Sequence, residues 1–568
     1  MTDAEAPLVL ETPGGLSVRY RGRLLYSGRD PSKLPRRLAG TCDRGPARLL
    51  LVPSPLLWYG VPELLAAMGE GSAVLCVEAD PALAALARSR MPERLRDDAR
   101  LAFLELHSVE AAIAAAASMG DFRSSSLVSL SGGQSLNASL YRAMAASLRD
   151  FFESEWRNRA ALMTLGPRWA SNILDNLAAL PWIDPSPPPR FPGAVVVCGA
   201  GPSLESALPF VAEGASSGRL GVVACDTALG SLLASGIEPD LVVCLEAQAY
   251  NLGDFTCAGS RPLALAADLS SHPATFRAVR GPKHLSFVRI TRSPFLDRVG
   301  EVLRSSGIPF LELPPLGSVG VHAFRLARLL SDGPILAAGL DFSFEPGKTH
   351  ARGCPSLLAE EARLGRLTRW PAQFAVSFRD RNIRLDPAGT DLGGAGPRLI
   401  TDPILLSYAA LLSDTASAGA DDAPEPGLYD IRGRGPSIGM RRVTLDRART
   451  IVEAAAPMGS GASWGGGPVA GGQRPDSAAA IASFLRGEAA RLEGLRKALR
   501  GGTKIPREEL ARLVADVDYL YWGFPDQRRA GDLAQDFLNR LVPQLEYRAQ
   551  RIEGLRGIMN PCAPQEPS

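Results

Sequence analysis

Short, continuous apolar runs recur through the middle of the chain, separated by segments whose apolar positions have helical spacing. A strand covered by helices on both faces is apolar at every position, whereas a half-exposed strand alternates. The pattern therefore predicts a mostly parallel α/β sheet, with crossover helices such as SLESALPFVAEG between the strands. The predicted strands are residues 194–199, 220–225, 241–246, 262–267, 284–290, 309–313 and 334–340.

The N-terminal part of the chain shows the same alternation on a smaller scale. Strand-like runs LLLVPS, AVLCVEAD and ARLAFLEL alternate with helix-like runs, which predicts a Rossmann-like domain over residues 48–150. Short β-prone runs around a Pro-Gly-Gly turn predict a β-hairpin cap within residues 1–47. We assign residues 151–192 to a helical connector that ends in the proline-rich linker PWIDPSPPPRFPG.

The C-terminal third of the chain changes character twice. Residues 413–475 are rich in Gly, Ala, Ser, Pro and Asp, which predicts a flexible linker. Residues 476–568 return to helical periodicity and predict a helical bundle. Residues 193–412 are then the central domain. The predicted fold class is α/β, with a Rossmann-like N-terminal unit, a doubly wound and mostly parallel central domain, and a C-terminal helical bundle.

Length and composition narrow the class of protein. A chain of 568 residues exceeds the roughly 250–300 residues that one core supports, which agrees with several domains. The formal net charge of +2 is too small to indicate a general nucleic-acid surface. The eight cysteines form no CxxC pair and have no zinc-site spacing. The N-terminus is unlike a signal peptide, and no apolar run has the length of a membrane span, so we expect a cytoplasmic protein.

The strongest local motif is AVVVCGAGPSLES at residues 194–206, where a buried strand meets a glycine-rich turn. Small residues let a backbone approach a ligand closely, and the start of a helix offers free N–H groups to a phosphate. The motif therefore predicts a phosphate site. The alternative is an ordinary tight turn in which Ser203 caps the following helix. The turn comprises Gly199, Ala200, Gly201, Pro202 and Ser203.

Two further strands deliver acidic residues to the same edge of the predicted sheet. Asp226 and Thr227 follow the strand at residues 220–225, and Glu246 ends the next strand. Open α/β sheets bind ligands at the carboxyl ends of their strands, where a carboxylate can accept hydrogen bonds from a ribose or a base. The alternative for Asp226 is a helix N-cap.

The segment 317–353 combines a second anion site with groups suited to transfer chemistry. Gly317 and Ser318 open a helix in which His322 is expected to be packed. The strand at 334–340 then delivers Asp341 at its carboxyl end. A histidine can act as a general base, and cations can offset the charge of a phosphate leaving group. The alternative is a solvated loop with scattered charges. The residues that follow Asp341 and carry this chemistry are Lys348, Thr349, His350 and Arg352.

In this order the motifs resemble the 6-hydroxymethylpterin diphosphokinase-like (MptE-like) domain. Motility-associated factor (Maf) proteins, glycosyltransferases that modify flagellin, share that domain. Tyr26-Ser27 with Asp30-Pro31, and RWASN at residues 168–172, also resemble N-terminal features of Maf proteins. The resemblance in the central domain is carried by GAGPSL from residue 199, CDTAL from 225, GIEPD from 236, GSV from 317, GLD from 339 and THA from 349.

The same motifs are more distantly similar to the nucleotide-sugar site of one bacterial sialyltransferase family. That resemblance implies that the glycine-rich turn contacts the nucleotide, Asp226 contacts the base or ribose, and Ser318 binds the sugar carboxylate. It also implies that His350 is the base that acts on the acceptor hydroxyl. The sialyltransferases have a tyrosine after their Asp-Phe pair, which Asp341-Phe342-Ser343-Phe344 lacks. Lys348 or Arg352 would then have to support the phosphate.

The resemblances imply a glycosyltransferase that moves a nonulosonic-type sugar from a CMP-sugar to Ser or Thr hydroxyls of flagellin. Two alternatives stay open. The first is a pterin diphosphokinase that uses ATP and Mg²⁺, with Asp226, Glu246 and Asp341 on the metal side. The second is a non-catalytic protein that binds a nucleotide or a flagellar partner.

The predicted site follows from these motifs. Its catalytic residues are His350 and Asp341, with no metal ligands and no certain cofactor. The first loop of the N-terminal unit, residues 52–60, lacks a G-x-G pattern, so we expect that unit to be structural or to dock a partner. The predicted nucleotide- and sugar-binding residues are Gly199, Ala200, Gly201, Pro202, Ser203, Asp226, Thr227, Glu246, Gly317, Ser318, Lys348, Thr349 and Arg352.

Overall fold

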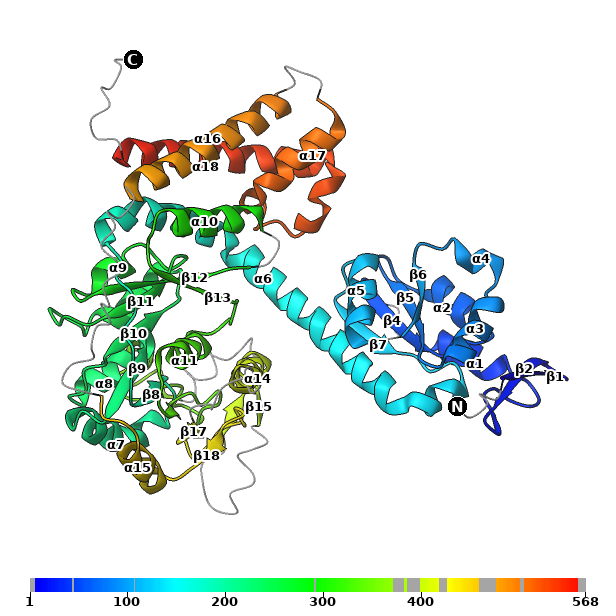
Figure 1. Cartoon of the computed structure of the whole chain (residues 1–568), viewed down its shortest axis with the longest axis horizontal. Coiled ribbons are helices and arrows are strands. Elements are labelled where there is room, and N and C mark those ends of the chain that lie inside the picture. Colours follow the sequence, from blue (N-terminus) through cyan, green and yellow to red (C-terminus); the bar gives the residue numbers. More distant parts are fainter. Residues whose placement is uncertain are drawn as a thin grey trace. The chain divides into compact units, whose positions relative to one another are not determined.

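A computed structural model of the chain divides into two compact units, Met1–Leu162 and Met163–Ser568. The boundary falls within the long helix α6 (Ala138–Ile183), and each unit is described by itself (Figure 1). No helix in the described part of the chain is long and apolar enough to cross a membrane. The structure describes residues 6–42, 45–106, 108–290, 293–370, 383–385, 399–417, 427–458, 477–500 and 505–559.

The first unit contains a four-stranded parallel sheet in the order β6-β5-β4-β7. The expected N-terminal hairpin is present and gains a third strand, which gives a separate antiparallel sheet of β1 (Leu8–Thr12), β2 (Gly15–Tyr20) and β3 (Arg23–Leu24). The elements of the main sheet and its helices are α1 (Lys33–Gly40), β4 (Arg48–Pro53), α2 (Val61–Ala67), β5 (Ala73–Glu78), α3 (Pro81–Ser89), α4 (Glu93–Arg96), β6 (Leu101–Glu105), α5 (Val109–Met119) and β7 (Ser124–Leu127).

The carboxyl end of β4 is filled by the unit's own side chains. Ser54, immediately after β4, is fully buried and donates to the Glu78 carboxylate at 2.6 Å. Tyr141 donates to the other oxygen of that carboxylate at 2.9 Å, and so does the Asp80 amide. Burial raises the pKa of Glu78, whereas these hydrogen bonds lower it. The arrangement favours the structural role expected for a loop without a G-x-G pattern.

The second unit is built on a nine-stranded sheet in the order β13-β12-β11-β10-β9-β8-β14-β17-β18. All of its neighbouring strands pair in parallel. The seven strands predicted from continuous apolar runs are all present. The sheet comprises β8 (Ala194–Cys198), β9 (Leu220–Cys225), β10 (Leu241–Cys244), β11 (Leu265–Asp268), β12 (Lys283–Val288), β13 (Phe310–Leu313), β14 (Ile335–Ala338), β17 (Leu428–Asp430) and β18 (Arg441–Arg442).

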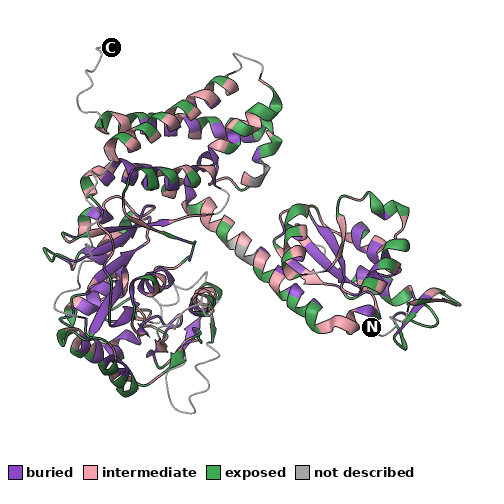
Figure 2. Cartoon of the chain, in the orientation of Figure 1, coloured by how far each residue is buried: buried purple, intermediate pink, exposed green. Residues whose placement is uncertain are grey.

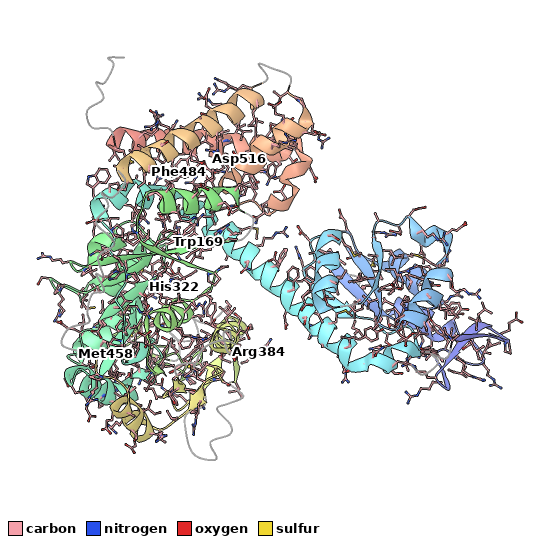
Figure 3. All side chains as sticks on the ribbon, in the orientation of Figure 1. Trp169, His322, Arg384, Met458, Phe484 and Asp516 are labelled. Atoms are coloured by element: carbon pink, nitrogen blue, oxygen red, sulfur yellow. The ribbon has the colours of Figure 1, made fainter. Side chains whose placement is uncertain are left out.

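Helices cover the sheet, so the strands in its centre are buried, as the purple arrows in Figure 2 show. α7 packs on β9 and contacts α15, whereas α11 packs on β8 and β9 and contacts α14. His322 on α11 is fully buried, as expected, with its Nε2 3.1 Å from Ser286 Oγ (Figure 3). Burial lowers its pKa to about 4. The helices are α7 (Leu204–Ser216), α8 (Leu229–Ala234), α9 (Thr275–Ala278), α10 (Pro294–Ser305), α11 (Val319–Leu330), α12 (Pro355–Glu361), α14 (Pro403–Ser417) and α15 (Leu445–Ala454).

The predicted flexible linker over residues 413–475 is wrong for the described residues 427–458. β17 pairs with β14 from Leu428↔Ile335 onward, and β18 pairs with β17, so this segment completes the central sheet. The strands are too short to form an apolar run. They are held instead by the Asp430 carboxylate, which bonds the buried Arg432 guanidinium through both oxygens at 2.9 and 2.8 Å. Residues 459–475 of the predicted linker lie outside the described residues.

The described residues of the C-terminal segment include the α-helices α16 (Ser477–Leu499), α17 (Arg507–Asp516) and α18 (Gln535–Met559). Two sets of contacts attach them to the rest of the second unit. The ring of Phe295 on α10 stacks at 4.3 Å on Tyr519. On α18, the buried Arg548 donates to Ser171 Oγ and to a backbone carbonyl of α6, and Arg551 pairs with Asp175.

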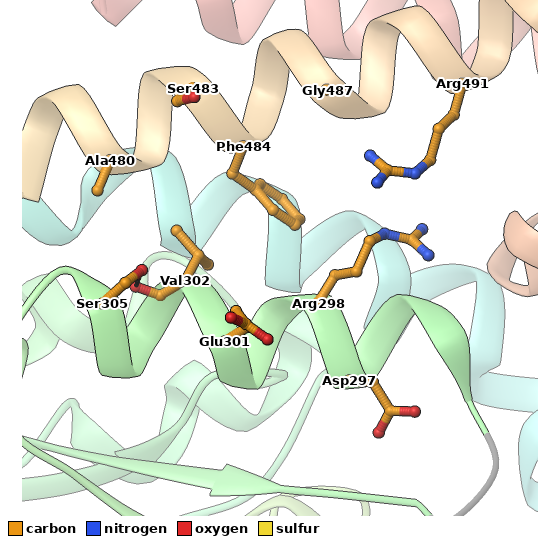
Figure 4. Close-up of a pocket in the computed structure, with 10 residues that line it drawn as sticks. All are labelled: Asp297, Arg298, Glu301, Val302, Ser305, Ala480, Ser483, Phe484, Gly487 and Arg491. Carbon is orange, nitrogen blue, oxygen red and sulfur yellow. Dashed lines mark hydrogen bonds between the residues drawn. The ribbon is translucent and has the colours of Figure 1, made fainter.

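A four-charge cluster joins α10 to α16 beside a cavity of about 520 Å³. The Glu488 carboxylate, fully buried, accepts from Arg298 at 2.7 Å and from Tyr519 at 3.2 Å. Asp516 pairs with both Arg298 and Arg491, at 3.0 and 2.9 Å. Figure 4 shows the two arginine side chains reaching toward one another from facing helices. None of the residues that line this cavity belongs to the predicted site.

Removing the Glu488 carboxylate is expected to destabilise the second unit by about 3 kcal/mol, because Arg298 and Tyr519 lose a buried partner. Glu488→Ala would be compared with the wild type by denaturant unfolding and calorimetry. The control is Glu493→Gln, since the Glu493–Arg496 pair is over one-third exposed and should contribute less than about 1 kcal/mol. Equal losses in the two variants would contradict a special role for the buried cluster.

Candidate functional site

The candidate site lies where the strand order of the central sheet reverses. From β8 the chain moves to β9 on one side, whereas β14 lies on the other side of β8. The carboxyl edge at such a switch point is the usual ligand site of an open α/β sheet. The glycine-rich turn after β8 and Asp341 after β14 therefore meet at this edge, as the sequence predicted.

The glycines of the turn make room for the neighbouring strand end. A Cβ on Gly199 would lie 2.5 Å from the Gly339 carbonyl oxygen, and a Cβ on Gly201 would lie 2.7 Å from Asp341 Cγ. The Gly201 amide donates to the Gly339 carbonyl at 2.7 Å. Gly339 itself has a φ of +63°. These contacts explain the glycines by backbone packing, without any ligand.

The start of α7 is already engaged by a carboxylate of the chain itself. The Ser203 amide donates to Asp341 Oδ2 at 2.7 Å, and the Ser203 hydroxyl donates to Oδ1. Ser203 therefore does not cap the helix with its side chain, contrary to the alternative considered from the sequence. Asp341 is 3% exposed. Burial raises its pKa, whereas the Ser203 hydrogen bonds and the arginines at 432 and 434 lower it. The geometry favours a positioning role for Asp341 over the catalytic role predicted.

Two arginines at this edge were missed because the sequence did not predict β17. The Arg432 guanidinium is buried and donates to the Leu340 carbonyl at 2.7 Å. Arg434 Nε lies 3.7 Å from Asp341 Oδ2, and its Nη1 pairs with Glu345. The signal in the sequence was the Arg-Gly-Arg-Gly run at residues 432–435, which is informative only once the preceding strand is placed in the sheet.

Glu205, in the first turn of α7, fixes the loop that carries the predicted base. Its carboxylate accepts from Lys348 Nζ at 2.8 Å and from the Arg352 amide at 2.8 Å. The Ala351 amide donates to the Ala200 carbonyl at 2.8 Å. The first and third predicted motifs are therefore in direct contact. The ammonium group of Lys348 is committed to this ion pair, whereas the Arg352 side chain is exposed.

The half-buried His350 is oriented by its neighbour. His350 Nδ1 lies 2.9 Å from Thr349 Oγ1, and that hydroxyl donates to Glu360 at 3.4 Å. The contact to Oγ1 is satisfied with Nδ1 either as donor or as acceptor, according to which ring nitrogen carries the hydrogen. In the tautomer with the hydrogen on Nδ1, the lone pair that a general base needs is on Nε2. Glu360 is a positioning residue that sequence reasoning missed.

The acidic group after β9 is a coupled pair of carboxyls. The hydroxyl of Thr227 lies 3.3 Å from Asp226 and 3.4 Å from Asp254. Burial, then the charge of Asp254, raises the pKa of Asp226 to about 7, and burial raises that of Asp254 to about 6. Asp226 also accepts a hydrogen bond from the Thr227 amide at 2.8 Å, but it is not the N-cap that the sequence offered as an alternative, since Cys225 holds that position. Asp254 was missed because it comes from a turn, η3 (Ala249–Phe255), rather than from a strand end.

For the predicted residues Glu246, Gly317 and Ser318, the structure gives no hydrogen bond to the glycine-rich turn among the described residues. Glu246 is half-buried and accepts the amide of its own neighbour, Ala247, at 3.0 Å. Gly317 has a φ of +65° and precedes Ser318 at the start of α11. A Cβ on Gly320, in the first turn of α11, would lie 2.6 Å from Leu340, which places this helix start next to the end of β14.

The three carboxylates of the diphosphokinase alternative do not form a common ligand set. Asp341 binds Ser203, Asp226 binds Thr227, and Glu246 binds a neighbouring amide. Among the residues that the structure describes, no three or more His, Cys, Asp or Glu side chains are grouped so as to hold a metal ion. No residues are therefore assigned to Mg²⁺.

A comparison with known families matches the part of the chain that contains the glycine-rich turn and Asp341. Residues 171–347 match the family model described as "6-hydroxymethylpterin diphosphokinase MptE-like", a range that runs from α6 through β14 and Asp341. The match ends before His350 and before β17, so the central sheet of this chain extends beyond the matched range.

Two proteins match the chain over nearly its whole length. An uncharacterized protein of Treponema pallidum (strain Nichols) is 28% identical over 570 residues, which cover 95% of this chain and 94% of that protein. The structure of the Maf glycosyltransferase from Magnetospirillum magneticum AMB-1 aligns with a TM-score of 0.53 at 13% identity, covering 98% of this chain and 92% of that one. The chain therefore shares the Maf glycosyltransferase fold.

Gly201→Ala is expected to destabilise the second unit by about 1–3 kcal/mol, because its Cβ would overlap Asp341 and separate the ends of β8 and β14. Thermal unfolding would measure the loss. The matched control is Gly253→Ala in η3, where a Cβ meets nothing within 4 Å. A stable Gly201→Ala variant would contradict the packing role of this glycine.

Asp226→Asn is expected to flatten the pH dependence of stability. Since the pKa of Asp226 is raised to about 7, the folded chain holds a proton that the unfolded chain releases near pH 4. Its free energy of unfolding therefore falls as the pH rises from about 4 to about 7, and then levels. The difference between the melting temperature of Asp226→Asn and that of the wild type should therefore increase as the pH rises from about 4 to about 7. Parallel melting curves from pH 4 to 8 would disprove the shift.

Proposed function

We propose that the chain is a glycosyltransferase that moves a nonulosonic-type sugar from a CMP-sugar to Ser or Thr hydroxyls of flagellin. The observation that carries this proposal is the attachment of the His350 loop to the glycine-rich turn, through Glu205 and the Ala200 carbonyl, at the switch point of the sheet. The Maf glycosyltransferase fold supports the reaction class. The motifs shared with motility-associated factor proteins support flagellin as the acceptor.

The proposed reaction assigns a separate task to each part of the site. His350 Nε2 takes the proton of the acceptor hydroxyl as its oxygen forms a bond to the anomeric carbon of the sugar. The bond from that carbon to the phosphate oxygen breaks, and its electron pair leaves with CMP. Cations beside the leaving group stabilise the developing charge. Arg352, with its exposed side chain, suits this task better than Lys348, whose charge is paired with Glu205.

His350→Ala is expected to keep donor binding and to lose transfer by about 10²–10⁴-fold, the usual contribution of a general base. The purified full chain would be tested with a CMP-nonulosonate and flagellin, with donor binding followed as a rise in melting temperature. The control is His272→Ala, which should retain transfer, because His272 contacts Glu246 through its backbone amide while its ring accepts from the Ala274 amide.

A wild-type protein whose melting temperature responds to neither CMP nor any CMP-sugar would overturn the proposal. Release of AMP from ATP in the presence of 6-hydroxymethylpterin would instead support the diphosphokinase alternative. Full transfer by His350→Ala would remove His350 from the mechanism while leaving the donor site intact.

A further inference from the structure

An exposed aromatic ring stands at the carboxyl edge of the central sheet, and the proposed function does not yet use it. Tyr250 lies in η3, which begins five residues after the last residue of β10, and it is 73% exposed. Large apolar rings at such a position lose contact with the protein core, so the fold does not need this ring for packing.

The surroundings of Tyr250 are those of the candidate site. Partial burial raises the pKa of Tyr250 most, the charges of Glu246 and Asp254 raise it further, and the charge of Arg168 lowers it. Tyr250 and Asp254 belong to the same short helix, η3. Asp254 joins Asp226 through the Thr227 hydroxyl. Tyr250 therefore borders the acidic pair that follows β9.

Side chains of α6 donate hydrogen bonds to the backbone on either side of η3, the segment that carries Tyr250. Asn172 Nδ2 donates to the Ala247 carbonyl at 3.1 Å, immediately before η3, and to the Ser270 carbonyl at 2.9 Å. Asn176, one turn later, donates to the Leu269 and Ser271 carbonyls at 2.8 Å each. The ring is thus mounted on a segment that two buried asparagines hold in place.

Strand spacing sets the layout of the edge. Neighbouring strands lie about 4.8 Å apart, so the end of β10 is about 10 Å from the end of β8. The order along the edge is β10, β9, β8, β14. It places Tyr250, the Asp226–Asp254 pair and the glycine-rich turn along the edge in this order. The His350 loop folds back over the turn, where the Ala351 amide donates to the Ala200 carbonyl and the Ser231 hydroxyl donates to the Arg352 carbonyl. A nucleotide-sugar is an extended ligand with its base at one end and its sugar at the other.

We infer that Tyr250 is the stacking platform for the nucleobase of the donor, which lies along this edge with its phosphate at the glycine-rich turn and its sugar toward His350. The inference rests on the proposed function and adds the orientation of the ligand. Stacking on an aromatic ring tolerates different bases, so the acidic pair beside the ring, rather than the ring itself, would select among them.

The test compares two ligands that differ only in the base. Calorimetric titration of the full chain with CMP and with ribose 5-phosphate would use the wild type, Tyr250→Ala, Tyr250→Phe and Tyr547→Ala. Tyr547 on α18 is another exposed tyrosine of the same unit, 49% exposed, and serves as the control. Tyr250→Ala is expected to weaken CMP binding by roughly 5- to 100-fold and to leave ribose 5-phosphate unchanged. Tyr250→Phe and Tyr547→Ala should bind both ligands as the wild type does.

The outcomes separate the inference from the proposed function. If the wild type binds CMP and Tyr250→Ala binds it equally well, the stacking role is wrong and the proposed function stands. An equal loss for both ligands would also overturn the stacking role, since it would mean that Tyr250 acts on the phosphate or on the fold. If the wild type binds neither ligand, the proposed function and the inference fall together.

Discussion

The hydrogen bonds between Ser203 and the Asp341 carboxylate hold together the two strand ends on which the candidate site is built. They connect the start of α7 to the end of β14 across the switch point of the sheet. A carboxylate at a helix N-terminus is favourable because it faces the unpaired amides and the positive end of the helix dipole. Here the carboxylate follows the adjacent strand, β14. The hydrogen bonds that it accepts at the start of α7 therefore also hold the end of β14 next to the turn after β8. The Glu205 bonds to the His350 loop depend on that same first turn of α7.

The C-terminal helices are connected to the candidate site through α6. Arg548 and Arg551 attach α18 to the face of α6 that bears Ser171 and Asp175. The asparagines of α6 in turn hold the backbone after β10 and β11. Arg548 is buried, and its guanidinium donates to two neutral oxygens of α6. The helices therefore contribute rigidity to one half of the ligand edge.

Apolar periodicity predicted the central strands because a doubly covered strand leaves an unambiguous pattern. It also placed the glycine-rich turn, Asp341 and His350 at one edge, since parallel strands end on the same side. The pattern did not reveal β17, whose three residues pair with a strand about 90 positions earlier and are held by the Asp430–Arg432 ion pair. Nor could spacing tell whether Gly201 makes room for a ligand or for the neighbouring strand. That distinction depends on Asp341, 140 positions away, and the same limit applies to Glu205 and Lys348.

The late strands of the sheet also decide where the domain can be divided. The matched family range ends at residue 347, yet β14 is flanked on its far side by β17 and β18, which come from residues 428–442. A fragment cut at the family boundary would leave β14 as an open edge, with unpaired backbone groups that invite pairing with other chains. It would also leave the Leu340 carbonyl without the Arg432 guanidinium. The unit of folding is therefore larger than the range that the family model matches.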